Sequence, residues 1–181
     1  SRRKLKKLVL FTVKKMRRSA ARIRVEGRNV GIRERKTLYY AWVHSHLMCN
    51  AGAYLPLLGS NQIRDLQTAA NAGIRAICRL PRRGQVPITA IRDQLGIPSV
   101  ETICRRVMWI ESWKRKPSIE AQAGPTTRGR SAGNVLTPDL RGLNGKRIQT
   151  LALATWNELP AGVRNETDKK KALAAIKKIC S

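Results

Sequence analysis

Residues 60–81 read SNQIRDLQTAANAGIRAICRLP, and this stretch decides the expected fold. Its apolar residues recur every three or four positions: Ile63, Leu66, Ala70, Ile74 and Ile77. That spacing is the period of one face of an α-helix. Pro81 closes the pattern, because its ring excludes the helical conformation from the residue before it. We therefore predict an amphipathic helix with one buried face.

Residues 2–24 have the same period and a much stronger charge. Their expected buried stripe is Leu5, Leu8, Val9, Thr12, Met16, Ala20 and Ile23. The stretch holds eleven Lys or Arg and no acidic residue. At about 100° per residue, the opposite face collects a ridge of cations: Arg3, Lys7, Lys14, Arg18 and Arg22. We predict a basic amphipathic helix.

Three interpretations of this basic helix stay open. Its cations could form an ordinary solvated face, or the helix could lie on a membrane or act as a transit segment, since such segments are also Arg-rich and poor in acids. It could also follow the phosphates of a nucleic acid. We favour nucleic acid because the rest of the chain is basic as well.

Other segments complete an all-α prediction. We expect a buried central helix from Glu34 to Tyr54, with Leu38, Trp42 and Cys49 along one side. The aromatic residues of this helix, Tyr39 and Tyr40, could stack on bases, but their spacing favours a place in the core. Its two histidines, His44 and His46, are predicted to be structural rather than catalytic. Shorter helices are expected before Gly96, after Ser99, and after Thr167 or Asp168. On the helix after Ser99, Trp109 and Trp113 either close the core edge or form an exposed platform.

The expected architecture is a small bundle of five to seven helices, because strand signals are weak throughout. Residues 116–145 lack periodicity and are rich in Pro, Gly, Ser and Thr, which predicts a flexible connection. We therefore expect a helical bundle with the basic N-terminal helix over residues 1–115, a linker over 116–145, and a C-terminal helical extension that packs on the bundle over 146–181.

Composition favours a nucleic-acid partner. The 181 residues include 37 Lys or Arg and 11 Asp or Glu, a net charge of +26. Such an excess of one sign opposes compaction unless an anion neutralises it. With 42% hydrophobic residues the chain can still build a core, and no apolar run is long enough to cross a membrane. The chain begins with Ser rather than Met, so we expect a piece of a longer protein.

The residues that catalysis and metal binding need do not cluster. The four aspartates are far apart in sequence, whereas two-metal phosphoryl transfer needs grouped carboxylates. No phosphate-binding P-loop sequence occurs. The four cysteines lack metal-ligand spacing and read as reduced thiols. We predict no catalytic residue, no metal site and no cofactor.

Four short motifs follow one another along the chain in an order that is typical of one protein family. The first motif joins Lys36-Thr37-Leu38-Tyr39 with Ser45-His46-Leu47, and the second is Ile77-Cys78-Arg79-Leu80-Pro81-Arg82-Arg83. Next come Leu95-Gly96-Ile97-Pro98-Ser99-Val100-Glu101 and Trp156-Asn157-Glu158-Leu159-Pro160. Over residues 33–180 this series resembles the region after the palm in reverse transcriptases of non-LTR (LINE-type) retrotransposons. Each motif alone is short, and the order carries the resemblance.

The resemblance implies that this region is the helical thumb with its C-terminal extension, which grips the template–primer duplex. The family's Tyr/Phe-x-Asp-Asp motif is absent, so the fragment should bind while the parent protein acts as an RNA-directed DNA polymerase. The implied partners are the parent's fingers and palm domains and a nucleic acid, whether RNA, RNA–DNA hybrid or duplex DNA. The implied location is the nucleus and cytoplasm of a eukaryotic cell, in a retrotransposon ribonucleoprotein that serves transposition. We expect a monomer.

The predicted nucleic-acid-binding residues fall into three groups. The main group is the ridge of Arg3, Lys7, Lys14, Arg18 and Arg22. A second group, chosen partly from the family motif, is Arg79, Arg82 and Arg83. The third, from the expected linker and the residues after it, is Arg128, Arg130, Lys146 and Arg147. The competing hypothesis for the whole chain is a basic RNA-scaffold protein of a ribonucleoprotein.

Overall fold

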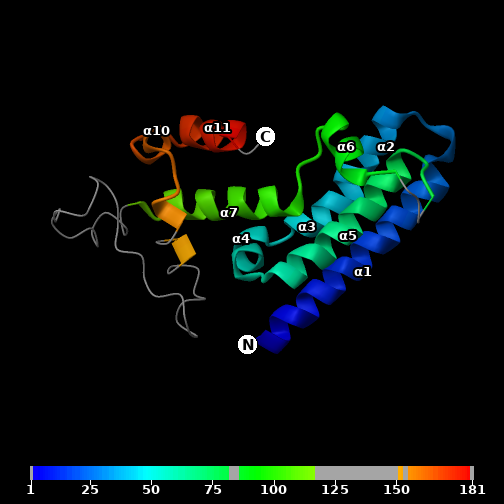
Figure 1. Ribbon diagram of the computed structural model, residues 1–181, viewed down its shortest axis with the longest axis horizontal. Coiled ribbons are helices and arrows are strands. Elements are labelled where there is room, and N and C mark those ends of the chain that lie inside the picture. Colours follow the sequence, from blue (N-terminus) through cyan, green and yellow to red (C-terminus); the bar gives the residue numbers. More distant parts are fainter. Residues whose placement is uncertain (1, 82–85, 117–150, 153–154, 180–181) are drawn as a thin grey trace. The chain divides into compact units, whose positions relative to one another are not determined.

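The computed structural model describes residues 2–81, 86–116, 151–152 and 155–179 (Figure 1). Every element within these ranges is helical, and no strand occurs among them. The all-α prediction is therefore confirmed. Almost all of the expected linker, residues 116–145, lies outside the described residues.

The chain divides into two compact units. The first comprises residues 1–51 and 58–101, and the second comprises residues 52–57 and 102–181. This division falls inside helix α7 (Val100–Lys114) rather than near residue 115. The expected boundaries at residues 115 and 145 stay a prediction.

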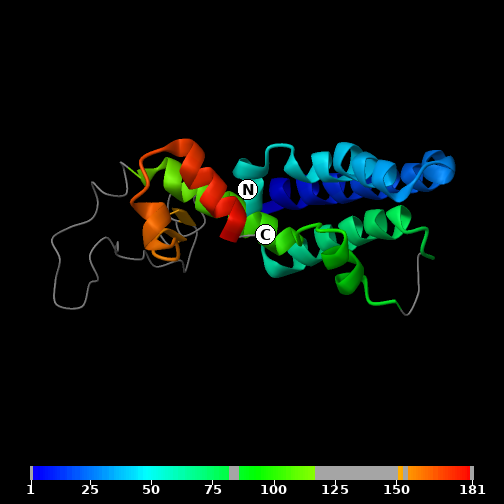
Figure 2. The ribbon, with the colours of Figure 1, turned by 90° about the horizontal axis from the view of Figure 1, so that it is seen from above.

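The first unit is built on two long helices that pack side by side, α1 (Arg2–Glu26) and α5 (Ser60–Ile77). A third rod packs against both and runs through α2 (Ile32–Leu38), the π-helical segment η2 (Tyr39–His44) and α3 (Ser45–Met48). Figures 1 and 2 show these three rods alongside one another. The 3-10 turn η1 (Gly27–Asn29) links α1 to the rod, and α6 (Ile88–Gln94) packs on α5.

The buried face of α1 follows most of the predicted stripe, but Leu5 is only half-buried and Leu8 is exposed. Val9, Met16 and Ile23 are buried, but Leu8 is 42% exposed and Val13 is buried in its place. The prediction for Leu8 was wrong because Leu8 lies one helical step of about 100° from Val9, at the edge of the packed face.

The third rod differs from the expected helix over Glu34–Tyr54. Its buried residues stand four apart: Arg35, Tyr39, Val43 and Leu47. The backbone N–H of Ser45 donates to Tyr40 O, five residues back, and this wider π turn keeps residues four apart on one side. Cys49 is exposed, so the face predicted from Leu38, Trp42 and Cys49 was wrong. The rotation of 100° per residue on which the predicted face was based does not hold through η2.

The rod also ends earlier than expected, at Met48. Cys49 is extended and Asn50 has a φ of 56°, a left-handed conformation that Asn tolerates better than most residues. The chain then forms α4 (Ala51–Tyr54) and the 3-10 turn η3 (Leu55–Leu57).

The predicted helix over 60–81 begins at Ser60 as its sequence indicates, but it ends at Ile77, before the expected stop at Leu80-Pro81. The backbone N–H of Gly59 donates to Gln62 Oε1 at 2.8 Å, which caps the first turn of α5. At the other end Leu80 N donates to Arg75 O at 2.9 Å, and Arg79 has a φ of 56°. This is a Schellman ending with a non-glycine residue in its left-handed position.

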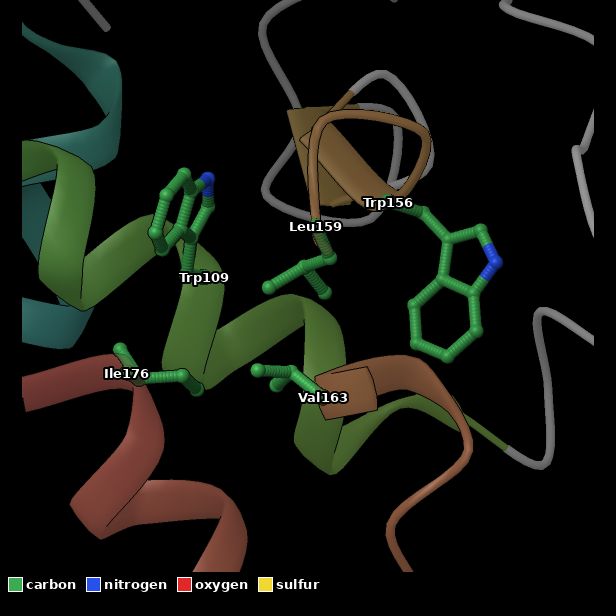
Figure 3. Packing of buried hydrophobic residues seen from close by; sticks show 5 residues of the cluster. All are labelled: Trp109, Trp156, Leu159, Val163 and Ile176. Carbon is green, nitrogen blue, oxygen red and sulfur yellow. The ribbon is translucent and has the colours of Figure 1, made fainter. Parts of the chain in front are cut away.

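The second unit has its own core, shown in Figure 3. Trp109 of α7 packs with Trp156, Leu159, Val163 of α10 (Ala161–Arg164) and Ile176 of α11 (Lys169–Ile179). The side chain of Leu159 lies between the two indoles in this view. Trp109 is buried and Trp113 is half-buried against the cluster, so the pair closes the core edge rather than forming a platform. Asp168 Oδ1 accepts the backbone N–H of Lys170 at 2.7 Å and caps α11 as predicted.

A buried polar contact fixes α7 in this core. The Ser112 hydroxyl is fully buried, lies 3.0 Å from Ala152 O and also contacts the Thr155 hydroxyl. Buried hydroxyls need such partners, because an unpaired one loses its water without compensation.

Replacing Gly73 with Ala should destabilise the first unit. A Cβ at Gly73 would lie 2.8 Å from Cδ2 and Cε2 of Tyr39, a ring that is 2% exposed. Overpacking costs about 1–3 kcal/mol, and the better helix propensity of Ala returns about 0.5–1 kcal/mol. We expect a net loss of about 1 kcal/mol or more in the free energy of unfolding, measured by urea titration with circular dichroism.

The matched control for this change is Gly162→Ala. No atom lies within 4 Å of a Cβ at Gly162, so this variant should keep or slightly gain stability. Equal effects of the two changes would contradict the packing between Gly73 and Tyr39.

Trp156→Ala should cost the second unit about 3–5 kcal/mol, because it empties a large volume at a residue that is 2% exposed. Hydrogen exchange of α7, α10 and α11 is the measurement, since it follows this unit alone. The half-buried Trp42 of the first unit gives the control, and Trp42→Ala should leave exchange in those helices unchanged. Unchanged protection in Trp156→Ala would show that Trp156 is not part of the core.

Candidate nucleic-acid interface

The outer face of α1 carries the predicted ridge. All five ridge residues are exposed: Arg3, Lys7, Lys14, Arg18 and Arg22. With 25 residues the helix is roughly 37 Å long, close to the length of one turn of a DNA duplex, about 34–36 Å. Its only acid is Glu26. The ridge can therefore face successive phosphates with little acidic charge to offset it.

Arg22 is held differently from the other four ridge residues. Its Nε donates to Glu26 Oε1, and its guanidinium lies 4.6 Å from the centre of the Trp42 ring. These contacts reduce the charge that Arg22 offers to a ligand. The part of the ridge that is most available to a ligand is the one formed by Arg3, Lys7, Lys14 and Arg18.

Apolar side chains interrupt the cations of α1. Leu10 and Phe11 are each 55% exposed, and the ammonium of Lys15 lies 4.5 Å from the centre of the Phe11 ring. An exposed ring beside cations can stack on a base or a sugar. Phe11 was not among the residues predicted from the sequence to bind nucleic acid.

Hollows with basic side chains in their lining lie along α1, and sequence reasoning missed them. One of them, of about 440 Å³, lies between α1 and α5 and is lined by Arg17 and Arg24 of α1 together with Thr68, Asn71 and Arg75 of α5; we call it the basic groove. The next hollow toward the N-terminus is lined by α1 residues alone, among them Leu10, Lys14 and Arg17. A further hollow is lined by Lys6 and Leu10 of α1 and includes the acidic Asp65 of α5.

The spacing of Arg17 and Arg24 could have identified this groove. The two residues are seven apart, so they lie on one line of α1, and that line borders the buried stripe. We had assigned cations only to the face opposite the stripe. Which flank of α1 stays open depends on where α5 packs, and the pattern of α1 alone does not contain that information.

Arginines converge where α1 ends. A hollow of about 210 Å³ is lined by Arg24 and Ile23 of α1, Gly27 and Arg28 of η1, Arg35 of α2, and Ala76 and Arg79 at the end of α5. None of these residues is acidic. Arg79 was predicted as a binding residue, and the structure places it here rather than with the ridge.

Three titratable groups in the first unit have shifted pKa values. Burial, and then the charge of Lys15, lowers the pKa of His46 below its usual value, so this imidazole is neutral at pH 7. Burial raises the pKa of the Cys78 thiol, and the nearby Arg35 guanidinium offsets part of that rise. Burial, together with Tyr40, also raises the pKa of the Tyr39 phenol. Tyr39 is a core residue, as expected.

The remaining predicted binding residues lie outside the described part of the chain: Arg82, Arg83, Arg128, Arg130, Lys146 and Arg147. Within the described residues, no three His, Cys, Asp or Glu side chains gather as metal ligands would. No helix in these ranges combines the length and the apolar character that crossing a membrane requires.

Arg79→Gly should raise the free energy of unfolding by up to about 1 kcal/mol. A residue with a Cβ is strained at a φ of 56°, and glycine is not. Arg64→Gly, the same change inside α5, should instead lower stability by about 1 kcal/mol. Urea titration measures both variants. A loss of stability in Arg79→Gly would mean that the Arg79 side chain supports the fold more than its backbone strains it.

No protein-family model matches this chain, and no curated protein or solved structure matches it. The basis for a function is therefore the set of residues described above, namely the exposed cations of α1, the groove beside them and the arginines at the end of the helix.

Proposed function

We propose that this chain is a non-catalytic module that binds the sugar–phosphate backbone of nucleic acids with little preference for sequence. The observation that carries the proposal is α1, whose ridge exposes five cations along a rigid 25-residue helix with one acid. Phosphate contacts of this kind fix the position of a protein on a nucleic acid without reading its bases.

The physical mechanism is the release of counterions. Each phosphate that a Lys or Arg neutralises frees condensed salt ions, so affinity falls steeply with salt concentration. If the module neutralises about five to seven phosphates of a duplex, the slope of log K against log salt should be roughly −4 to −6. The helix supplies a rigid spacing, so less backbone conformational entropy is lost on binding than in a disordered basic tail.

We further propose that the module is the thumb of a retrotransposon reverse transcriptase. The support is the order of the motifs between residues 36 and 160, together with a basic helical surface that could lie along an RNA–DNA hybrid. Such a hybrid resembles A-form RNA, whose minor groove is wide and shallow. Polymerisation would then belong to the parent RNA-directed DNA polymerase, whose fingers and palm would be the module's protein partners. Its location would be the nucleus and cytoplasm, within a retrotransposon ribonucleoprotein.

The competing hypothesis is an RNA-scaffold protein of a ribonucleoprotein, and its binding behaviour would differ. A scaffold should select one folded RNA, whereas a thumb should accept many duplex sequences. Fluorescence anisotropy with single-stranded RNA, duplex DNA and an RNA–DNA hybrid of unrelated sequence, across a salt series, separates the two. Competition by anionic vesicles tests the membrane-surface interpretation, to which the exposed Leu10 and Phe11 lend some support.

Reversing three ridge charges tests the placement of the binding surface. The variant Lys7→Glu, Lys14→Glu, Arg18→Glu should weaken binding to all sequences alike and flatten the salt slope by up to about 3 units. All three side chains are exposed, so circular dichroism should show an intact fold.

The charge-matched control places the same reversals on α11, at Lys170, Lys171 and Lys177, which are also exposed. This control should lose much less affinity. An equal loss in both variants would show that total charge, and not the ridge, drives binding. Unchanged affinity in the ridge variant would reject the ridge as the main contact.

A further inference from the structure

Arg35 is the most unusual residue of the arginine-lined hollow at the end of α1. It is 8% exposed, and its Nε and Nη1 atoms are buried without a hydrogen-bond partner in the described part of the chain. A buried guanidinium with unsatisfied N–H groups costs folding free energy unless an acceptor or an opposite charge approaches it. Among the described residues that line this hollow, none carries a negative charge to offset that of Arg35.

The residues around Arg35 leave space for its side chain and give the hollow apolar walls. A Cβ at Gly27 would lie 3.0 Å from Cγ and 3.2 Å from Cδ of Arg35, so the absence of a side chain at Gly27 lets the stem of Arg35 pass. Ile23 and Ala76 supply apolar walls to the hollow. The low-polarity wall strengthens any electrostatic attraction inside.

Two neighbouring arginines are fixed in position by backbone carbonyls. Arg24 Nη1 donates to Leu80 O at 2.9 Å, and Arg79 Nη2 donates to Arg28 O. The Arg79 guanidinium keeps further N–H groups beyond the one that its bond to Arg28 O uses. The backbone of Arg79 is left-handed, a conformation that glycine would adopt with less strain. Such strain is often found at ligand sites.

We propose that this hollow binds a single phosphate group, and that the group belongs to the backbone of a bound nucleic acid. Arg35 and Arg79 are the residues that would hold it, and Arg24 and Arg28 border the site. The assignment of the phosphate to nucleic acid rests on the proposed function. It is supported by Arg24, which lines both this hollow and the groove that follows α1, so a strand in the groove would reach the hollow.

The first test uses the full chain and inorganic phosphate. Thermal unfolding is followed in sodium phosphate and in sodium chloride at equal ionic strength and pH, because a ligand that binds only the folded state raises the melting temperature. We expect phosphate to raise it in a saturable way. Arg35→Met should abolish that response, since it keeps an unbranched stem beside Gly27 and removes only the charge.

Arg33→Met is the matched control. It removes an exposed arginine from the same helix that does not line the hollow, and it should keep the phosphate response. In chloride, Arg35→Met should melt at the wild-type temperature or above it, because it removes an unpaired buried charge. A phosphate response that survives in Arg35→Met overturns the proposal.

Arg79→Gly is a second variant whose fold should not suffer, because its backbone conformation suits glycine. It should weaken the phosphate response while the melting temperature in chloride stays at or above that of the wild type. If Arg79→Gly keeps the full response, the place of Arg79 in the site is wrong.

The second test asks where the phosphate comes from. With a short duplex in the anisotropy assay, Arg35→Met should lower affinity by roughly tenfold, the effect of losing a hydrogen bond to a charged group, and flatten the salt slope by about 1. Loss of the phosphate response with unchanged duplex affinity would overturn the assignment to nucleic acid. If the wild type binds no nucleic acid at all, the proposed function fails, whereas a phosphate response that depends on Arg35 would still identify the hollow as an anion site.

Discussion

The first unit depends on the close approach of α1 and α5 and of the rod that contains Tyr39. Small residues on α5, namely Ala69, Ala70, Gly73 and Ala76, are buried at this contact. They let the larger side chains of α1 and of the rod fill the space between the three backbones, as dense packing requires. The positions of the ridge, the groove and the arginine cluster all follow from this contact, because it decides which sides of α1 are covered.

Charge works against this packing. The chain carries a net charge of +26. The cationic side chains crowded on α1 repel one another and the other basic residues nearby. The hydrophobic stripe from Val9 to Ile23 must outweigh that repulsion in the absence of an anion. A polyanion would therefore both bind the protein and stabilise it, and the two effects should be linked in any measurement at low salt.

Much of the fold could be predicted from the sequence, since the signals were local. The period of residues 63–77, the stop at Gly96 and the cap at Asp168 each depend on a few neighbouring residues, and the structure agrees with all three. The π turn between Tyr39 and His44 could not be predicted, because periodicity assumes a constant step. The ridge was also predictable, since it lies opposite the stripe. The groove and the arginine-lined hollow were not, because their residues come from helices far apart in sequence, and only packing brings Arg24, Arg35 and Arg79 together.

The path of the chain has a practical consequence for dissecting this protein. Residues 52–57 belong to the second unit, yet residues 1–51 and 58–101 on both sides of them belong to the first. Tyr54, Leu55 and Pro56 are all buried, and a cut after Glu101 would remove the rest of the unit to which they belong. The two units are thus not consecutive along the chain, because a segment of the second interrupts the first. A fragment meant to isolate the first unit needs a redesigned, polar connection in place of residues 52–57.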